Sequence, residues 1–272
     1  MLVYKYMPTD RFFTNFKFRF TPAEDLNDPR ELVPDIRLRN PDRYVNDIVA
    51  RNLESTYWRL RIANPLLSAD EVWGRCVAAA EQFKENFDPN SSVREIYEMF
   101  MRTTNRHVGV LSLTEDPCNE VMWAHYAANY AGFVVGLDSE SAFFQPKQNE
   151  PRTCGELMNV MYTNTAPVVY VEPRKLDIPK EVFFTKTVQW EYEREWRMIK
   201  YLPHADEVLD VGGKAIHLFR VPVEAVKEVI FGSKVDPAAA SRLDAEIRTR
   251  APHIQLRQVS FVPSDGLKLS SR

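Results

Sequence analysis

The sequence has few cysteines, and their number and spacing exclude two kinds of structural site. Only 3 cysteines occur among its 272 residues. Cys76, Cys118 and Cys154 are odd in number and far apart, which argues against a disulfide framework and against a cysteine zinc site. This usage is typical of a reducing compartment, so we expect a cytoplasmic protein.

Glycine and long apolar runs are also scarce. The chain has 9 glycines and contains neither GxGxxG nor GxxxxGK[ST], so the usual phosphate-binding loops are missing. The longest apolar stretch, residues 121–137, is interrupted by His125, Asn129 and Gly132 and is too polar to span a bilayer. The first ten residues, MLVYKYMPTD, lack a signal-peptide pattern. We therefore expect no membrane partner.

Charge and histidine content narrow the function classes further. The net charge of −3 and the sequence pI of about 6.0 do not match a general nucleic-acid binder, although a local basic patch stays open. The 5 histidines are scattered and form neither HxH nor HExxH, so no metal site is predicted. With 44% hydrophobic residues, the chain can bury a sizeable core.

The first 106 residues contain a strand-like zone and then a helical zone. Residues 16–20 read FKFRF, an alternation with the period of a half-buried strand. Asn40-Pro41 is typical of a helix cap followed by proline at the first helical position. Residues 68–71 (SADE) and 92–95 (SVRE) match capping boxes. These signals predict a helical insertion over about residues 40–106.

Residues 107–272 alternate between strand and helix patterns. Strands are expected at 108–113, 133–137, 168–171, 229–231 and 254–261, and helices at 120–130 and 237–250. Gly212-Gly213 predicts a hairpin turn, because glycine supplies the positive φ that the turn requires. We therefore predict a single α+β domain over residues 1–272, with a mixed, mainly antiparallel sheet and the helical insertion.

The stretch WEYEREWR, which begins at Trp190, fits a strand better than a helix. On a helix, Glu191 and Glu195 would form a like-charge pair, whereas a strand sorts the aromatic residues from the acids. We predict a strand over about residues 194–201, with a turn before it. One face would then carry the carboxylates of Glu193 and Glu195 about 7 Å apart. This row is either cross-strand surface pairing or part of a site.

Several short motifs, in order along most of the chain, resemble domain-of-unknown-function family 2971, a family of bacterial domains. The motifs are Tyr4-Lys5-Tyr6, Leu26-Asn27-Asp28-Pro29 with Glu31, Leu111-Ser112, Met122-Trp123-Ala124-His125-Tyr126 followed by Gly132-Phe133, Lys186, and Tyr192-Glu193-Arg194-Glu195-Trp196-Arg197. The central run and the last run are the specific ones. The name of the family implies no activity, so this resemblance indicates kinship and leaves the function open.

A looser resemblance links the chain to ADP-ribosyltransferases. One class of these enzymes carries an arginine on an early strand, Ser-x-Ser/Thr on a middle strand and Glu-x-Glu on a late strand. Arg19, Ser112-Leu113-Thr114 and Glu193-Arg194-Glu195 follow this order. The resemblance implies an ADP-ribosyltransferase-like core that uses NAD, with Glu195 as the catalytic carboxylate and Glu193 positioning or deprotonating the acceptor.

The remaining site candidates each have a plain structural alternative. Trp123 and Tyr126 would form a wall for a base or nicotinamide ring, or else pack in the core. His125 is either a site residue or a hydrogen-bonded structural histidine. Candidates for catalysis are Glu195, Glu193 and His125, and candidates for binding the nucleotide are Lys5, Tyr6, Arg19, Asn27, Asp28, Ser112, Trp123, Tyr126 and Arg197.

Three functions therefore stay open at this point. The first is an NAD-dependent ADP-ribosyltransferase-like enzyme that modifies a protein or nucleic acid, in the context of a toxin or of stress or phage defence. The second is a non-enzymatic module that binds a nucleotide or a partner. The third is a nuclease that would use Asp28, Glu31 and Glu195 with Mg²⁺.

Overall fold

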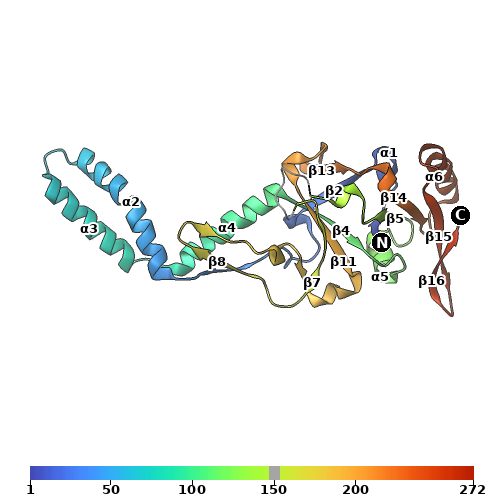
Figure 1. Cartoon of the computed structure of the whole chain (residues 1–272), viewed down its shortest axis with the longest axis horizontal. Helices are drawn as coiled ribbons and strands as arrows, with labels where there is room; N and C mark the ends of the chain where they lie inside the picture. Colours follow the sequence, from blue (N-terminus) through green and yellow to red (C-terminus); the bar gives the residue numbers. More distant parts are fainter. Residues whose placement is uncertain (147–153) are drawn as a thin grey trace. The chain divides into compact units, whose positions relative to one another are not determined.

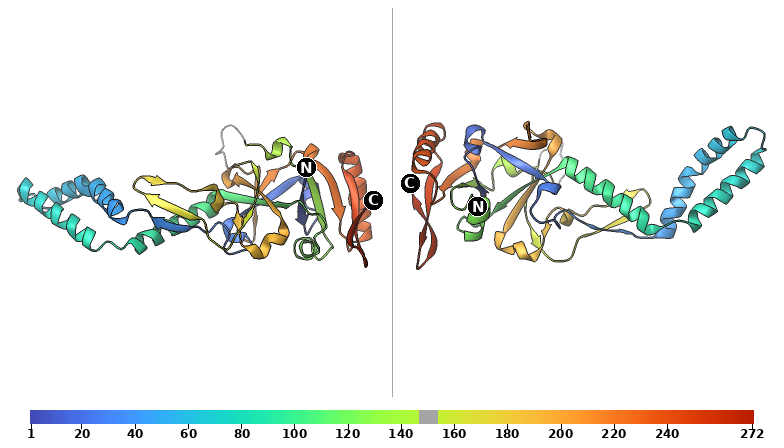
Figure 2. Two further views of the ribbon diagram at one scale, coloured as in Figure 1. Left: turned by 60° about the horizontal axis from the view of Figure 1, so that its bottom comes forward. Right: turned by 180° about the vertical axis from the view of Figure 1, so that it is seen from behind.

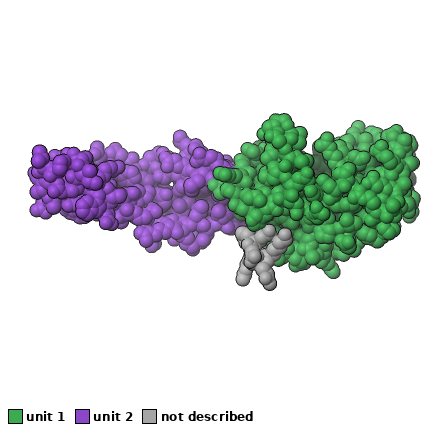
Figure 3. Space-filling model, turned by 90° about the horizontal axis from the view of Figure 1, so that it is seen from above, with its two compact units in different colours: residues 1–32, 103–165, 183–272 green, residues 33–102, 166–182 purple. Residues whose placement is uncertain are grey.

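The computed structural model describes residues 1–146 and 154–272, and it divides the chain into two units (Figure 3). Unit 1 comprises residues 1–32, 103–165 and 183–272, and unit 2 comprises residues 33–102 and 166–182. The helical zone predicted over about residues 40–106 belongs to unit 2, apart from its last residues. Each unit has its own sheet, so each is described by itself.

Unit 1 is built from strands with a few short helices (Figure 1). Its helices are α1 (Phe12–Asn15), α5 (Glu120–Tyr126) and α6 (Pro237–Arg250), with short 3-10 turns that include η4 (Val188–Glu193). Its strands are β1 (Leu2–Met7), β2 (Lys17–Pro22), β4 (Val108–Thr114), β5 (Phe133–Asp138), β6 (Leu157–Asn159), β7 (Met161–Tyr162), β10 (Thr185–Lys186), β11 (Glu195–Tyr201), β12 (Glu207–Val211), β13 (Lys214–Arg220), β14 (Val226–Phe231), β15 (Gln255–Val262) and β16 (Gly266–Ser271).

Within the described residues, eleven of these strands form one sheet. The order is β12-β13-β2-β4-β1-β5-β14-β15-β16, and β11 pairs with β4 and with β6. The pair β14 and β15 is parallel, and the other pairs in this sheet are antiparallel. The predicted α+β class with a mixed, mainly antiparallel sheet is confirmed.

Strand β4 is the point at which the sheet divides. Along one edge it pairs with β11 over its whole length. Along the other edge, Thr114 pairs with Tyr4 of β1, and Val110 pairs with Thr21 of β2. Between these two contacts no described strand pairs with this edge of β4. Ser112 lies in the gap, and its backbone is therefore open to side-chain partners.

Helices pack on this sheet, with α6 beside β15 and away from the division at β4 (Figures 1 and 2). On one face, Phe12 and Phe13 of α1 and Leu243 of α6 join the largest buried apolar cluster. On the other face, Met122 and Trp123 of α5 pack with aromatic residues of β1. Burial of these apolar side chains is the main stabilising contribution to the unit. It holds α5 and β1 together beside β4.

Unit 2 consists of the helices α2 (Pro41–Ala63) and α3 (Ala69–Glu85), most of α4 (Pro89–His107), and a sheet of β3 (Asp35–Leu38), β8 (Val168–Glu172) and β9 (Lys175–Leu176). Asn40 caps α2 and Ser68 forms a full capping box with Glu71, as predicted. The predicted box at Ser92 is wrong. Helix α4 already begins at Pro89, because Asp88 accepts hydrogen bonds from the backbone of the first turn.

The helix predicted over residues 120–130 is shorter than expected. Helix α5 ends at Tyr126, and Ala128, Asn129 and Tyr130 all have positive φ. Strand β5 begins three residues later and pairs with β1 from Phe133 onward. The chain therefore has to leave the helix early to enter the sheet.

Within residues 1–146 and 154–272, no helix combines the length and the apolar character that a bilayer span requires. The long helix α2 has 23 residues, but charged side chains are distributed along it.

Candidate functional site

The stretch WEYEREWR folds as a short helix, a turn and a strand. Helix η4 ends at Glu193, Arg194 adopts the left-handed conformation with φ of 43°, and β11 begins at Glu195. The predicted strand with a turn before it is therefore confirmed. The predicted row of Glu193 and Glu195 on one strand face is wrong, because Glu193 precedes the strand. The reversal at Arg194 instead directs both carboxylates to one cation.

That cation is Lys186, the centre of a buried network of five charged side chains. Lys186 Nζ lies 2.6 Å from Glu193 Oε2, 3.1 Å from Glu195 Oε2 and 3.4 Å from Glu31 Oε1. Arg197 donates from Nε to Glu195 Oε1 at 2.8 Å and from Nη2 to Glu31 Oε2. All five residues are buried. Glu31 and Arg197 are 166 residues apart in sequence, so this network joins distant segments.

The network contains three carboxyl groups and only two cations. Burial raises the pKa of Glu195, but Arg197 and Lys186 outweigh it and lower the pKa to about 2. For Glu31, burial outweighs the same two cations, and its pKa is raised. Burial lowers the pKa of Lys186, yet the surrounding carboxylates raise it overall. Glu195 therefore stays ionised, whereas the raised pKa of Glu31 favours its protonated form, which lets the network approach neutrality.

A polar chain leads from this network to α5. Asn27 Nδ2 donates to the hydroxyl of Tyr126 at 3.0 Å, and that hydroxyl donates to Glu193 Oε1 at 2.6 Å. Burial and the bond to Glu193 raise the pKa of Tyr126, so its hydroxyl stays protonated at neutral pH. Asn27 and Tyr126 thereby orient one wall of the site.

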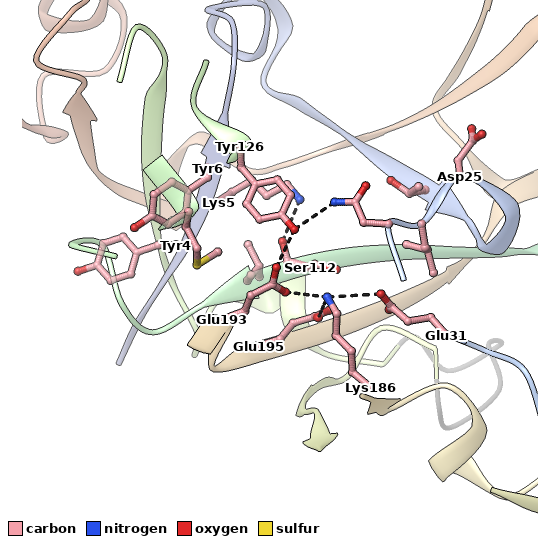
Figure 4. A pocket seen from close by; sticks show the side chains of 15 residues that line it. Tyr4, Lys5, Tyr6, Asp25, Glu31, Ser112, Tyr126, Lys186, Glu193 and Glu195 are labelled. Atoms are coloured by element: carbon pink, nitrogen blue, oxygen red, sulfur yellow. Dashed lines mark hydrogen bonds and ion pairs between the residues drawn. The ribbon is translucent and has the colours of Figure 1, made fainter. Parts of the chain in front are cut away.

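A pocket of about 200 Å³ opens above these groups, at the division of the sheet (Figure 4). Lys5 extends from β1 and donates from Nζ to the backbone oxygen of Ser112 at 2.9 Å. Burial lowers the pKa of Lys5 to about 8, although the negative charges of Glu195 and Glu193 raise it in part. The lining residues are Tyr4, Lys5, Tyr6, Thr21, Asp25, Leu26, Asn27, Glu31, Ser112, Leu113, Met122, Tyr126, Lys186, Glu193 and Glu195.

The pocket thus brings together seven of the predicted site residues from five segments of the chain. They are Lys5, Tyr6, Asn27, Ser112, Tyr126, Glu193 and Glu195. Tyr6 is held by its own hydrogen bond, since its hydroxyl donates to the backbone oxygen of Asp116 at 2.9 Å. The arrangement offers carboxylate acceptors, hydroxyl groups, an amide and an amine to one small polar ligand.

Five other predicted site residues do not line the pocket. Arg19 pairs with Asp25 at 2.5 Å, and Asp28 accepts a hydrogen bond from the hydroxyl of Thr187 at 2.7 Å. Trp123 is fully buried in the core cluster on α5 and donates from Nε1 to a backbone oxygen. His125 is exposed on α5, and Arg197 lies beneath the pocket as part of the charge network.

Two residues that hold the site, Lys186 and Tyr162, were given no site role from the sequence. Lys186 was noted only as a single residue, without neighbouring motif residues. Nothing around it in the sequence indicated that three carboxylates contact it. Tyr162 accepts a hydrogen bond at its hydroxyl from the backbone N–H of Glu195 at 2.7 Å. No local pattern marks Tyr162, because its partner is 33 residues away.

The three acids proposed for a nuclease do not form a cation site. Among the residues that the structure describes, no group of three or more histidine, cysteine or acidic side chains is placed to hold a metal ion. Glu31 and Glu195 already accept hydrogen bonds from Arg197. Asp28 accepts from Thr187 instead. A divalent cation at this place would have to displace Arg197 and Lys186.

Comparison with known proteins connects the site to one family. Residues 122–198 match the model of a family described as a protein of unknown function (DUF2971). The matched segment contains α5 from Met122 onward and four of the five residues of the charge network. No curated protein matches the chain, and no solved structure matches it either.

Proposed function

We propose that unit 1 is an NAD-using enzyme that transfers an ADP-ribosyl group to a macromolecule. The observation that supports this most is the setting of Glu195. Its carboxylate is 2% exposed, stays ionised and forms part of the pocket wall. A fixed negative charge in a low-dielectric pocket is suited to a transition state that develops positive charge on a sugar.

The order of the strands gives independent support. Strand β4, which carries Ser112-Leu113-Thr114, lies between β1 and β11. Glu195, on β11, pairs directly with Thr114, on β4. The serine and glutamate elements of the ADP-ribosyltransferase pattern are therefore neighbours. On the other side of β4, Lys5 and Tyr6 occupy the pocket, and Arg19 does not, which favours β1 as the early strand of the pattern.

The chemistry follows from the side chains that line the pocket. Glu195 would accept a hydrogen bond from a ribose hydroxyl and stabilise the positive charge that builds up as nicotinamide leaves. Tyr126 and Asn27 would hydrogen-bond the sugar, and Glu193 would receive the proton of the acceptor. The pocket of about 200 Å³ is smaller than the roughly 300–1,000 Å³ of sites for drug-sized ligands, so it would hold only the nicotinamide riboside part.

Release of nicotinamide from NAD by the purified chain tests this proposal. We expect slow release in the wild type and a loss of at least tenfold in Glu195→Gln, because an amide carries no charge. The matched control is Glu81→Gln, on exposed surface of unit 2, which should release nicotinamide at the wild-type rate. Circular dichroism shows whether each variant is folded. Equal rates in a folded Glu195→Gln variant would remove the proposal.

A second candidate function is nucleotide binding without turnover. Both oxygens of Glu195 already accept from cations, Arg197 at Oε1 and Lys186 at Oε2. A carboxylate whose charge is already balanced by two cations favours a structural role over a catalytic one. Thermal stabilisation by NAD with no release of nicotinamide, in both the wild type and Glu195→Gln, would select this function.

A further inference from the structure

Lys5 differs from the other two cations of the site in its partners. Lys186 contacts three carboxylates, and Arg197 contacts two. Within the described residues, Lys5 Nζ makes one hydrogen bond, to the backbone oxygen of Ser112. This bond forms in the gap where β4 has no neighbouring strand. The amine is thus placed in a pocket without a carboxylate bound directly to it.

This setting changes the protonation of the amine. Burial lowers the pKa of Lys5 from 10.5 to about 8, so its neutral fraction at pH 7 exceeds that of an ordinary lysine on the order of a hundredfold. A neutral, desolvated lysine is a good nucleophile toward carbonyl carbon. The perturbation and the pocket coincide, as expected of a functional amine.

The other walls of the pocket indicate what kind of molecule would meet this amine. Asn27, Ser112 and Tyr126 supply amide and hydroxyl groups for hydrogen bonds to hydroxyls of a ligand. Tyr126 keeps its proton and donates it in a hydrogen bond to Glu193, which fixes how both side chains face the ligand. The small volume restricts the ligand to a few carbon atoms or to one end of a larger molecule.

We propose that Lys5 is a nucleophilic amine that forms an imine with a small hydroxylated aldehyde or ketone bound in this pocket. The lone pair of Nζ attacks the carbonyl carbon, and the π pair of the C=O bond moves to oxygen. The C–N double bond then forms as the C–O bond breaks. Both hydrogens of the neutral amine leave with that oxygen as water, so the step needs no oxidant or reductant.

This inference goes beyond the proposed use of NAD and does not depend on it. It is tested by brief treatment of the whole chain with limiting glyceraldehyde and cyanoborohydride at pH 7, which reduces each imine to a stable amine. Peptide mass spectrometry then gives the extent of modification at each lysine. We expect at least tenfold more adduct on Lys5 than on Lys175. Lys175 is exposed, but a 2.6 Å ion pair with Asp177 raises its pKa.

Two controls separate a binding pocket from a merely reactive amine. Propanal has the same carbon number without the hydroxyls, and we expect its preference for Lys5 over Lys175 to be several-fold weaker. Lys5→Arg keeps the charge but removes the nucleophile. Fragment ions separate the α-amine of Met1, which lies on the same peptide, and any adduct beyond that on Met1 should disappear. If this variant does not fold, the wild-type ratio alone decides.

Three results would overturn the inference. They are no more adduct on Lys5 than on Lys175, equal selectivity for glyceraldehyde and propanal, or an adduct beyond that on the α-amine of Met1 that persists on this peptide in a folded Lys5→Arg variant. A high Lys5 ratio in a chain that releases no nicotinamide would instead reject the proposed function and leave the imine site intact. The two proposals can therefore fail separately.

Discussion

In unit 1, Glu195 and Arg197 are 2% and 0% exposed, whereas in unit 2 helix α2 leaves Trp58 and Ile62 55% and 77% exposed. One unit buries charge, and the other exposes apolar surface. Neither arrangement maximises the stability of its unit. Buried ion pairs such as those of unit 1 can often be replaced by apolar residues without loss of stability. Exposed apolar side chains such as Trp58 and Ile62 likewise contribute little to the stability of unit 2.

This difference between buried charge in unit 1 and exposed apolar surface in unit 2 shows which part of each unit is not optimised for stability. The buried charges of unit 1 lie at a pocket, and under the proposed function they have a chemical use for which apolar residues cannot substitute. The helices of unit 2 depend instead on local signals such as caps and on a narrow seam, where Val72 and Cys76 of α3 are buried. Mutations should therefore have large effects in the network and small effects on the helices.

Arg197→Met should have the largest effect. It removes one of two cations from three buried carboxyl groups, and breaking such a pair destabilises by about 3–5 kcal/mol. Urea unfolding followed by circular dichroism gives the change in free energy. The matched variant in unit 2 is Arg51→Met, which breaks the exposed pair with Asp47 and should cost less than about 1 kcal/mol. Similar losses in both variants would contradict the contrast between the units.

Glu195→Gln should have the next largest effect, and it should depend on pH. Folding lowers the pKa of Glu195 from 4.5 to about 2, so its ionised form contributes on the order of 3 kcal/mol above pH 4.5. That contribution is lost as the pH falls from about 4.5 toward 2. The stability difference from wild type should therefore be full at pH 7 and smaller at pH 3. A difference that is constant over this range would show that charge is not its cause.

Glu31→Gln sharpens the same comparison within the network. Folding raises the pKa of Glu31, so its contribution is favourable below pH 4.5 and is lost as the pH rises through the raised pKa. Glutamine mimics the protonated carboxyl group. We therefore expect this variant to unfold within about 1 kcal/mol of wild type at pH 7. A loss as large as that of Glu195→Gln would mean that both carboxylates are equally needed as anions.

Local patterns predicted the elements of the site better than its contacts. The two-residue period placed β11 to within one residue, because each face of that strand meets a different environment. The Gly-Gly turn was also predictable, and both glycines have positive φ, 63° and 81°. Such features depend only on neighbouring residues.

The contacts that complete the site are long-range or conformationally unusual. A residue such as Arg194 rarely adopts the left-handed conformation, so the predicted turn could not be placed at this residue and Glu193 was put on the strand face. The approach of Arg197 to Glu31 depends on how the chain crosses the sheet. Tyr130 stacks on Trp123 although it lies beyond the end of α5, within the residues that were predicted to be helical.

Ser68→Ala should have the smallest effect of these changes. The hydroxyl of Ser68 accepts from the backbone N–H of Glu71 at 3.3 Å, and removing such a cap usually costs about 1 kcal/mol. Because α3 relies on this cap and a narrow seam, the loss should appear as faster amide hydrogen exchange in the first turn of α3. Exchange in β11 should not change. Faster exchange in both α3 and β11 would mean that the two units unfold together. The difference in burial between the units would then not correspond to a difference in their stability.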